Sequence, residues 1–399
     1  MKRWFIFILT IVLIFPLCPC MRASAEADIS AQAAILMEAG TFEILYEKNA
    51  REKRSMASTT KIMTTLLTLE SGDLDTPFTV DPKAIRVEGS SMGLQEGDTV
   101  TRRALCYGML LPSGNDAANA AAVSVAGSIP AFAERMNQRA TEIGMSHTCF
   151  VTPSGLEGEG HGSSAYDMAL LTREALQNPE FAEICCQRSV KLRFGNPPYD
   201  RTLYNSNKLL SMYEGVIGVK TGFTDEAGRC LVSACKRDGI TLICVTLNAP
   251  DDWNDHMCLY DMGFSMLEPR TLALPEHLTI PAAGGSNTEI PLKPKHPVTV
   301  GWKKGAESDI TVIVKRFPFA WAPVHKGDVL GTLEYRRGGR IVAQVKLLAD
   351  AEVPAQPPKP LTWREKLFRQ RQLKIRRTYG RNQNSENTRR CGLLLTPEG

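Results

Sequence analysis

Ser58 and Lys61 stand three residues apart in the stretch 58–61, Ser-Thr-Thr-Lys, a pairing that suits nucleophilic catalysis. Apolar residues between 62 and 69 recur with helical spacing, so Ser58 is expected near the start of a buried helix. Lys61 then lies one turn further on, with its amine within reach of the Ser58 hydroxyl. Burial that lowers the pKa of this amine would let it take the hydroxyl proton. The stretch therefore predicts an acyl-transfer serine with a lysine base.

The plainest alternative is a helix whose first serine or threonine caps the backbone while the lysine is solvated. A second S-x-x-K pair, Ser233 and Lys236, offers an internal comparison. It falls in a strand-like run, where residues i and i+3 point to opposite faces of a sheet. We therefore expect this second pair to be catalytically inert.

Ser113 and Asn115 frame the triplet Ser-Gly-Asn, which follows an apolar run and precedes the alanine-rich stretch 116–123. This context predicts a loop that opens a helix, where serine and asparagine ordinarily serve as caps. Beside a catalytic serine, Ser113 could instead pass a proton to a leaving nitrogen, and Asn115 could hold a substrate amide. Both interpretations stay open on this motif alone.

Lys220, Thr221 and Gly222 end a strand-like stretch. A substrate peptide could pair with this strand, and Gly222 would let the two backbones come close. Lys220 and Thr221 would offer a cation and a hydroxyl to a terminal carboxylate. The Phe223 N–H would complete an oxyanion hole with the N–H of Ser58. In isolation, a strand end with a surface lysine explains the triplet equally well.

The first 25 residues have the layout of a secretory leader. Lys2 and Arg3 precede an uncharged apolar run, 4–17, and Ala-Ser-Ala at 23–25 supplies a cleavage site. An uncleaved membrane anchor is the alternative, but a spanning helix needs about 20 apolar residues. The run has 14. We expect cleavage before Glu26 and an exported, extracytoplasmic protein.

Cysteine usage argues against a disulfide framework and against a metal site. Nine of the eleven cysteines follow the leader, an odd number at irregular spacings. Cys230, Cys235 and Cys244 fall among strand-like residues, where a cysteine behaves as a small buried hydrophobe. No group of Cys and His residues has the spacing of a zinc site. We expect neither a metal nor any other cofactor.

Three regions follow the leader. The mature length exceeds the ~250–300 residues at which single cores stop growing, so more than one domain is expected. Helix-like and strand-like segments mix from 26 to 270, the expected catalytic domain. Strand-like alternation, as in 309–315 and 341–347, predicts a small all-β domain over 275–352. A proline-rich linker and a basic tail make up 353–399.

The tail differs in charge from the rest of the chain. Residues 356–399 hold eleven Lys/Arg against three Asp/Glu, whereas the body from 26 to 355 has a net charge of −7. A basic tail suits an anionic partner such as phospholipid or wall polymer, and an exported protein rarely meets nucleic acid. The tail is compatible with an interfacial helix, peripheral on the outer face of the cytoplasmic membrane, and equally with a solvated extension. The helix would insert four apolar residues: Trp363, Leu367, Phe368 and Ile375.

The motifs are embedded in longer familiar stretches, 58–64, 109–118, 153–156, 163–169, 205–210 and 218–224. Together these resemble the serine-type D-alanyl-D-alanine carboxypeptidases, the low-molecular-weight penicillin-binding proteins. The resemblance implies an α/β (α+β) catalytic domain of the serine β-lactamase and transpeptidase type. In such a domain an antiparallel sheet is flanked by helices, and here a small all-β C-terminal domain would follow.

By this resemblance, Ser58 is the acylated nucleophile, Lys61 its base, and Lys220 the carboxylate anchor, while Ser113 and Asn115 form the second motif. The implied reaction removes the terminal D-alanine from peptidoglycan stem pentapeptides through an acyl-enzyme, and β-lactam antibiotics such as penicillin would acylate the same serine. The partners so implied are peptidoglycan stem peptides and, as inhibitors, β-lactams.

One departure from the family is visible. Its Gram-negative members carry a carboxylate-binding arginine downstream of the K-T-G triplet, and the corresponding stretch here, 247–256, has none.

Two other functions compete with the carboxypeptidase. A class A-like β-lactamase would need a glutamate in an E-x-x-L-N motif, which Glu174–Asn178 does not match in spacing. A catalytically idle penicillin- or wall-binding protein would not need the intact serine and lysines.

Overall fold

The computed structural model describes residues 28–307, 309–357 and 362–367. The expected leader, 1–25, lies outside these residues. By its internal contacts the chain divides into two compact units. Within the described residues, the first comprises 28–274, 297–307, 309–312 and 335–343, and the second comprises 275–296, 313–334, 344–357 and 362–367. All three sequence motifs belong to the first unit.

The first unit is built on a five-stranded antiparallel sheet with the strand order β2-β1-β9-β8-β7. Its three interior strands are buried along most of their length, as expected when both faces of a sheet are covered. The strands are β1 (Ala33–Glu38), β2 (Ile44–Lys48), β7 (Val216–Thr224), β8 (Gly228–Arg237) and β9 (Ile240–Leu247).

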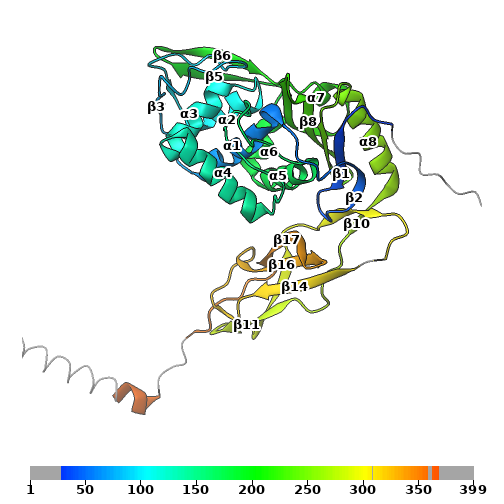
Figure 1. Cartoon of the computed structure of the whole chain (residues 1–399). Coiled ribbons are helices and arrows are strands. Elements are labelled where there is room, and N and C mark those ends of the chain that lie inside the picture. The colour runs from blue at the N-terminus through cyan, green and yellow to red at the C-terminus, as the bar shows by residue number, and fades with distance from the viewer. Residues whose placement is uncertain (1–27, 308, 358–361, 368–399) are drawn as a thin grey trace, which may run out of the picture. The chain divides into compact units, whose positions relative to one another are not determined.

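Helices cover both faces of this sheet (Figure 1). Side chains alternate along β1: Ile35 and Met37 belong to the core beneath the larger helical group, and Ala34 and Leu36 to the core beneath α8 (Asp252–Met266). The predicted catalytic fold, an antiparallel sheet flanked by helices, is confirmed. The larger group consists of α1 (Lys61–Glu70), α2 (Arg102–Leu110), α3 (Asn115–Ala126), α4 (Ile129–Ile143), α5 (Ala165–Gln177) and α6 (Pro179–Cys185).

Smaller elements complete the first unit. A short helix, α7 (Leu209–Met212), precedes β7, and three antiparallel strand pairs lie outside the main sheet. The eight cysteines in the described part of the chain are free thiols. Those predicted to be small buried residues in strands, Cys230, Cys235 and Cys244, are buried in β8 and β9. The outer pairs are β3 (Phe78–Thr79) with β4 (Thr99–Val100), β5 (Ser189–Gly195) with β6 (Pro198–Tyr204), and β10 (Leu267–Thr271) with β13 (Thr299–Lys303).

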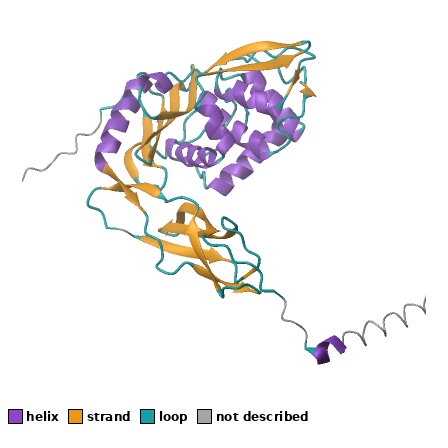
Figure 2. Ribbon diagram, turned by 180° about the vertical axis from the view of Figure 1, so that it is seen from behind, coloured by secondary structure: helices purple, strands orange, loops and turns teal. Residues whose placement is uncertain are grey.

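The C-terminal region is all-β, as predicted (Figure 2). The strands expected over 309–315 and 341–347 are present as β14 (Ile310–Arg316) and β17 (Arg340–Ala349). They belong to a six-stranded sheet with the order β14-β16-β17-β12-β11-β15. The other members are β11 (Thr279–Ala283), β12 (Glu289–Pro294), β15 (Ala320–Trp321) and β16 (Val329–Arg337).

The proline-rich linker begins in contact with the second unit, because Ser286 N–H donates to the Pro354 carbonyl at 3.0 Å and Gln356 N–H to Gly284 at 2.8 Å. Residues 363–367 then form a helical turn that starts with a capping box between Thr362 and Glu365.

Within the described ranges, every helix is too short or too polar to cross a bilayer. The two remaining residues of the proposed apolar face, Phe368 and Ile375, lie outside the described residues.

Candidate active site

Ser58 lies in a 3-10 turn, η1 (Ala57–Thr60), that leads directly into α1. The predicted position near the start of a buried helix is therefore confirmed. Ala57 has a left-handed backbone conformation with φ of 47°, which non-glycine residues seldom adopt and which turns the chain sharply before the serine. The Lys61 amine lies 2.8 Å from the Ser58 hydroxyl oxygen, as the one-turn spacing predicts.

Lys61 is completely buried and has three oxygen neighbours. Besides the Ser58 hydroxyl, its Nζ donates to Asn115 Oδ1 at 2.7 Å and to the Ser154 carbonyl at 2.6 Å. Burial lowers the pKa of Lys61 well below 10.5, and the charge of Lys220 lowers it further against the opposing effect of Asp116. A neutral amine has only two hydrogens. These go to the amide and carbonyl oxygens, which cannot donate, and the lone pair is left for the Ser58 O–H.

Lys220 is also fully buried, and its Nζ donates to the Thr221 carbonyl at 2.7 Å. Burial lowers its pKa to about 7. The charge of Lys220 in turn lowers the pKa of Lys61. While Lys220 is protonated, it therefore favours the neutral form of the base.

The K-T-G triplet lies on β7, which is an edge strand of the main sheet. Gly222 passes very close to the nucleophile turn: a Cβ added there would lie 3.1 Å from the Ser58 nitrogen and 3.1 Å from the Met56 carbonyl oxygen. A side chain at this position would therefore push the strand away from the serine. The open edge of β7 leaves room for an extended peptide to pair with it.

Ser113 and Asn115 lie where α3 begins, as predicted. Ser113 has a positive φ of 67°. The Asn115 amide is engaged on both sides by the protein, because Oδ1 accepts from Lys61 and Nδ2 donates to the Glu88 carbonyl at 2.7 Å. The observed partner of the Asn115 side-chain oxygen is thus the base, Lys61. A direct contact between Asn115 and a substrate amide stays a prediction.

A cleft of about 360 Å³ opens at Ser58. Five predicted residues line it, whereas Lys61, Asn115 and Lys220 are buried and do not. The lining also includes residues that the motifs did not indicate. The full set is Ser58, Ser90, Pro112, Ser113, Ser206, Lys208, Thr221, Gly222, Phe223, Arg229, Asp252 and Trp253.

Arg229 is the most consequential of the residues missed by sequence analysis. The hairpin between β7 and β8 places it opposite Phe223, and its Nη2 lies 2.6 Å from Oδ1 of the buried Asp252. The signal available in the sequence was that Arg229 follows the K-T-G triplet closely, so a short hairpin would bring it back beside that triplet. The stretch 247–256 indeed has no arginine, and Arg229 reaches the cleft from the neighbouring strand instead.

Asp116 was also missed. This buried carboxylate at the start of α3 accepts from the backbone N–H groups of Met92, Gly93 and Leu94 at 2.9 to 3.0 Å, and from the Ser91 hydroxyl. It thereby holds the loop that supplies Ser90 to the cleft wall.

The second S-x-x-K pair behaves as predicted. Ser233 is buried within β8 and interacts with His256 Nδ1 and the Tyr260 hydroxyl, whereas Lys236 is exposed. The two side chains therefore cannot act as a nucleophile and its base. The first pair differs because its residues lie one turn apart at the start of a helix.

Two family models match the chain. One, for D-alanyl-D-alanine carboxypeptidase, covers residues 20–251, and the other, for the C-terminal domain of penicillin-binding protein 5, covers 276–355. D-alanyl-D-alanine carboxypeptidase DacF of Bacillus subtilis is 33% identical over 343 residues, which span 83% of this chain and 88% of the relative.

Solved structures agree with these matches. The DD-transpeptidase of Streptomyces K15 superimposes with a TM-score of 0.58 at 33% identity, over 60% of this chain and 99% of its own. Penicillin-binding protein 5 of Haemophilus influenzae superimposes with a TM-score of 0.59 at 27% identity, over 82% of this chain and 98% of its own. Since the first family model spans every motif and more than half of the sequence, the chain belongs to the D-alanyl-D-alanine carboxypeptidase family.

Proposed function

We propose that the protein is a serine D-Ala-D-Ala carboxypeptidase that removes the terminal D-alanine from peptidoglycan stem pentapeptides and is acylated by penicillin. The observation that carries this proposal is the environment of Lys61. A buried amine with two fixed acceptors and a serine hydroxyl 2.8 Å away is arranged to take that hydroxyl's proton. Family membership supplies the substrate class.

In the proposed reaction, the substrate's last residues pair along β7. Ser58 Oγ attacks the carbonyl carbon of the penultimate D-alanine while Lys61 takes its proton. The N–H groups of Ser58 and Phe223 stabilise the oxyanion. Ser113 passes the proton to the leaving nitrogen, the C–N bond breaks, and D-alanine departs. Water, deprotonated by the same amine, then attacks the ester carbonyl. The bond between the acyl carbon and Ser58 Oγ breaks, and Lys61 returns the proton to Ser58 Oγ.

Release of D-alanine from a pentapeptide, measured beside turnover of nitrocefin, separates this function from its competitors. Carboxypeptidase activity predicts D-alanine release and a long-lived penicilloyl ester at Ser58 identified by mass spectrometry. Fast nitrocefin turnover without D-alanine release would indicate a β-lactamase. A stable ester without D-alanine release would indicate an idle penicillin-binding protein.

Arg229 is proposed to bind the terminal carboxylate together with Thr221, because its guanidinium lies in the cleft wall and is fixed by Asp252. Lys220, a buried residue of β7, then acts through the effect of its charge on Lys61. A guanidinium–carboxylate hydrogen bond contributes about 1.5–3 kcal/mol, which corresponds to roughly a 10- to 100-fold change.

Arg229→Ala combined with Asp252→Asn, which leaves no unpaired buried carboxylate, should raise KM for a D-Ala-D-Ala peptide by about that factor. The same variant should hardly alter KM for the peptide with a C-terminal amide. Arg237→Ala is the control, because Arg237 is on the same strand and binds the Glu214 carbonyl instead. Equal effects on acid and amide peptides would contradict the carboxylate contact.

The tail is proposed to hold the exported enzyme on the outer face of the cytoplasmic membrane. Its net positive charge and the exposed Trp363 and Leu367, at 71% and 52% accessibility, support contact with anionic headgroups.

A chain truncated after Pro357 should keep full activity on soluble peptide, since every residue that lines the cleft lies before residue 254, and should no longer bind anionic vesicles. Binding by the mature full-length chain should weaken with salt, because ions screen headgroup attraction. Vesicle co-sedimentation at low and high ionic strength measures both. Failure of the full-length protein to bind at low salt would leave the tail as a solvated extension.

A further inference from the structure

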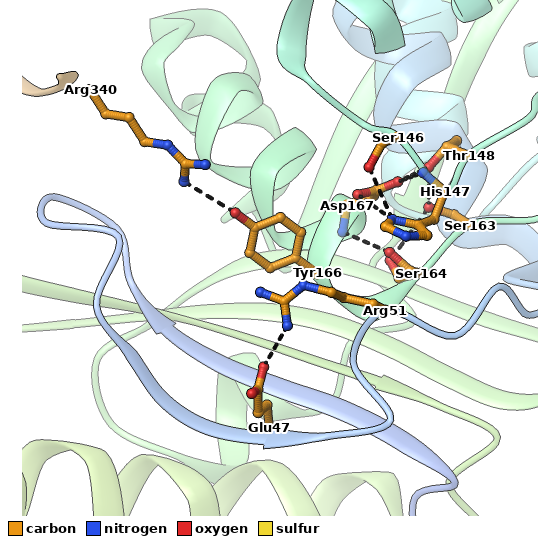
Figure 3. Close-up of polar contacts among 10 residues, drawn as sticks. All are labelled: Glu47, Arg51, Ser146, His147, Thr148, Ser163, Ser164, Tyr166, Asp167 and Arg340. Atoms are coloured by element: carbon orange, nitrogen blue, oxygen red, sulfur yellow. Dashed lines mark hydrogen bonds and ion pairs between the residues drawn. The ribbon is translucent and has the colours of Figure 1, made fainter. Parts of the chain in front are cut away.

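The loop between α4 and α5, residues 146–164, is tied down at both ends. At its start, Asp167 Oδ2 accepts from the His147 N–H and from the Thr148 hydroxyl, each at 2.7 Å (Figure 3). At its end, Ser164 caps α5. Paired backbone segments join Cys149 to Gly162 across the loop. The middle of the loop is therefore presented in a fixed conformation.

This middle part contacts the nucleophile segment at several points. The Ser154 carbonyl accepts from Lys61, and the Pro153 carbonyl accepts from Thr64 Oγ1 at 2.6 Å. Glu157 accepts from the Ser55 hydroxyl at 3.0 Å and from Thr224 Oγ1 at 2.6 Å. The loop thus holds both the base and the residues that flank the serine.

His161 makes a further contact with the nucleophile segment, and its hydrogen bonds define its tautomer. The Val151 N–H, which can only donate, lies 3.0 Å from His161 Nδ1, so Nδ1 is unprotonated. The ring proton is then on Nε2, which lies 3.0 Å from Thr60 Oγ1 and donates to it. Thr60 in turn donates to the Ala57 carbonyl at 2.9 Å. Burial lowers the pKa of His161 to about 4, so the ring is neutral at ordinary pH.

The chain of bonds ends at the strained residue next to the nucleophile. Ala57 holds its positive φ directly before Ser58, and the Ser58 N–H is the proposed oxyanion donor. Gly155 packs so closely on the Ala57 carbonyl that a Cβ there would overlap it. A left-handed alanine persists only where its surroundings impose it. Here Thr60, which is hydrogen-bonded to His161, and Gly155 both contact the Ala57 carbonyl.

We propose that His161 is a positioning residue for acylation: through Thr60 it fixes the Ala57 carbonyl, and with it the direction of the Ser58 hydroxyl and N–H. The proposal rests on the proposed function of Ser58. His161 itself does not line the cleft and acts only through the turn. Loss of the bond should slow the chemical step while leaving recognition at β7 and Arg229 unchanged.

His161→Phe keeps a ring but removes both hydrogen bonds. We expect its acylation rate constant to fall about 10- to 100-fold, since small misplacements of a reacting group have effects of this size. The reversible dissociation constant of the β-lactam should stay within about twofold. His161→Gln, whose amide can accept from Val151 and donate to Thr60, should recover most of the rate. Stopped-flow acylation with a fluorescent penicillin separates the two constants.

His256→Phe is the matched control, because His256 is equally buried and hydrogen-bonded to Ser233 and Thr246, away from the cleft. It should lower the free energy of unfolding without changing the acylation rate constant. A folded His161→Phe enzyme with the wild-type rate constant, or one slowed no more than His256→Phe, would overturn the proposal.

A second measurement keeps the proposal independent of the assignment of Ser58. Nitrogen-15 chemical shifts of the imidazole should report the Nε2–H tautomer, and Thr60→Val should perturb the Nε2 shift. A proton on Nδ1 would overturn the positioning role even if acylation is normal. Absence of any label on wild-type Ser58 would instead refute the proposed function.

Discussion

Ser58→Ala should abolish covalent labelling by penicillin and D-alanine release, with activity falling by at least about 10⁴-fold, because within the described residues Ser58 supplies the one hydroxyl that is hydrogen-bonded to the Lys61 amine. The fold should survive, since the side chain loses only one oxygen at a partly exposed position. Steady-state release of D-alanine and mass spectrometry of the labelled peptide measure the two effects.

The chain provides its own control for this experiment. Ser233→Ala alters the other S-x-x-K serine, whose hydroxyl is buried against His256 and Tyr260. It should leave labelling intact and reduce stability by roughly 1–3 kcal/mol, because buried polar partners lose a hydrogen bond. Penicillin attached at Ser233 would refute the assignment of the nucleophile.

Lys61→Arg should reduce the acylation rate constant by about 10³-fold, within the range that general-base catalysis contributes. A guanidinium stays charged, so it cannot accept the Ser58 proton. It also places a larger cation among the Asn115 and Ser154 oxygens, and thermal unfolding should be measured beside the rate. A folded variant that retains a tenth of the wild-type rate would point to a different base.

If Lys61 is the base, the acylation rate should also change with pH in a defined direction. The base works when neutral, so the rate should rise with pH as Lys61 loses its proton, at a pKa well below 10.5. The neighbouring cation works when protonated, so the rate should decline again as Lys220 deprotonates at about 7. Lys220→Met should remove the declining limb and shift the rising limb to higher pH, since the like charge that lowers the pKa of Lys61 is gone. A rising limb that stays in place would contradict the coupling.

Sequence analysis succeeded where one local element carries the chemistry. Ser58 and Lys61 are a turn apart, so helical spacing alone predicts their contact. Strand alternation alone likewise predicts that Ser233 and Lys236 do not form a catalytic pair. The all-β character of the C-terminal region likewise follows from alternation within single strands, as in β14 and β17.

Apart from Arg229, which lies across a short hairpin from Phe223, the contacts that were missed join residues far apart in the sequence. His161 reaches Thr60 over 101 positions, and Lys61 reaches Ser154 over 93. Periodicity describes which face of an element is buried and does not name the partner on another element. Asn115 illustrates the difference: its place at a helix start was predictable, whereas its bond to Lys61, 54 positions away, was not.

The edge position of β7 has a consequence for the protein's solubility. An edge strand offers unpaired backbone groups to any other strand, including the same strand of a second molecule, and edges of this kind promote aggregation. Natural sheets counter this with charges that point inward from the edge strand, because a second copy cannot pair flatly without disturbing them. Lys220 is such a charge on β7, completely buried. When it is protonated, below its pKa of about 7, we therefore expect the same lysine to protect a binding edge that must stay open.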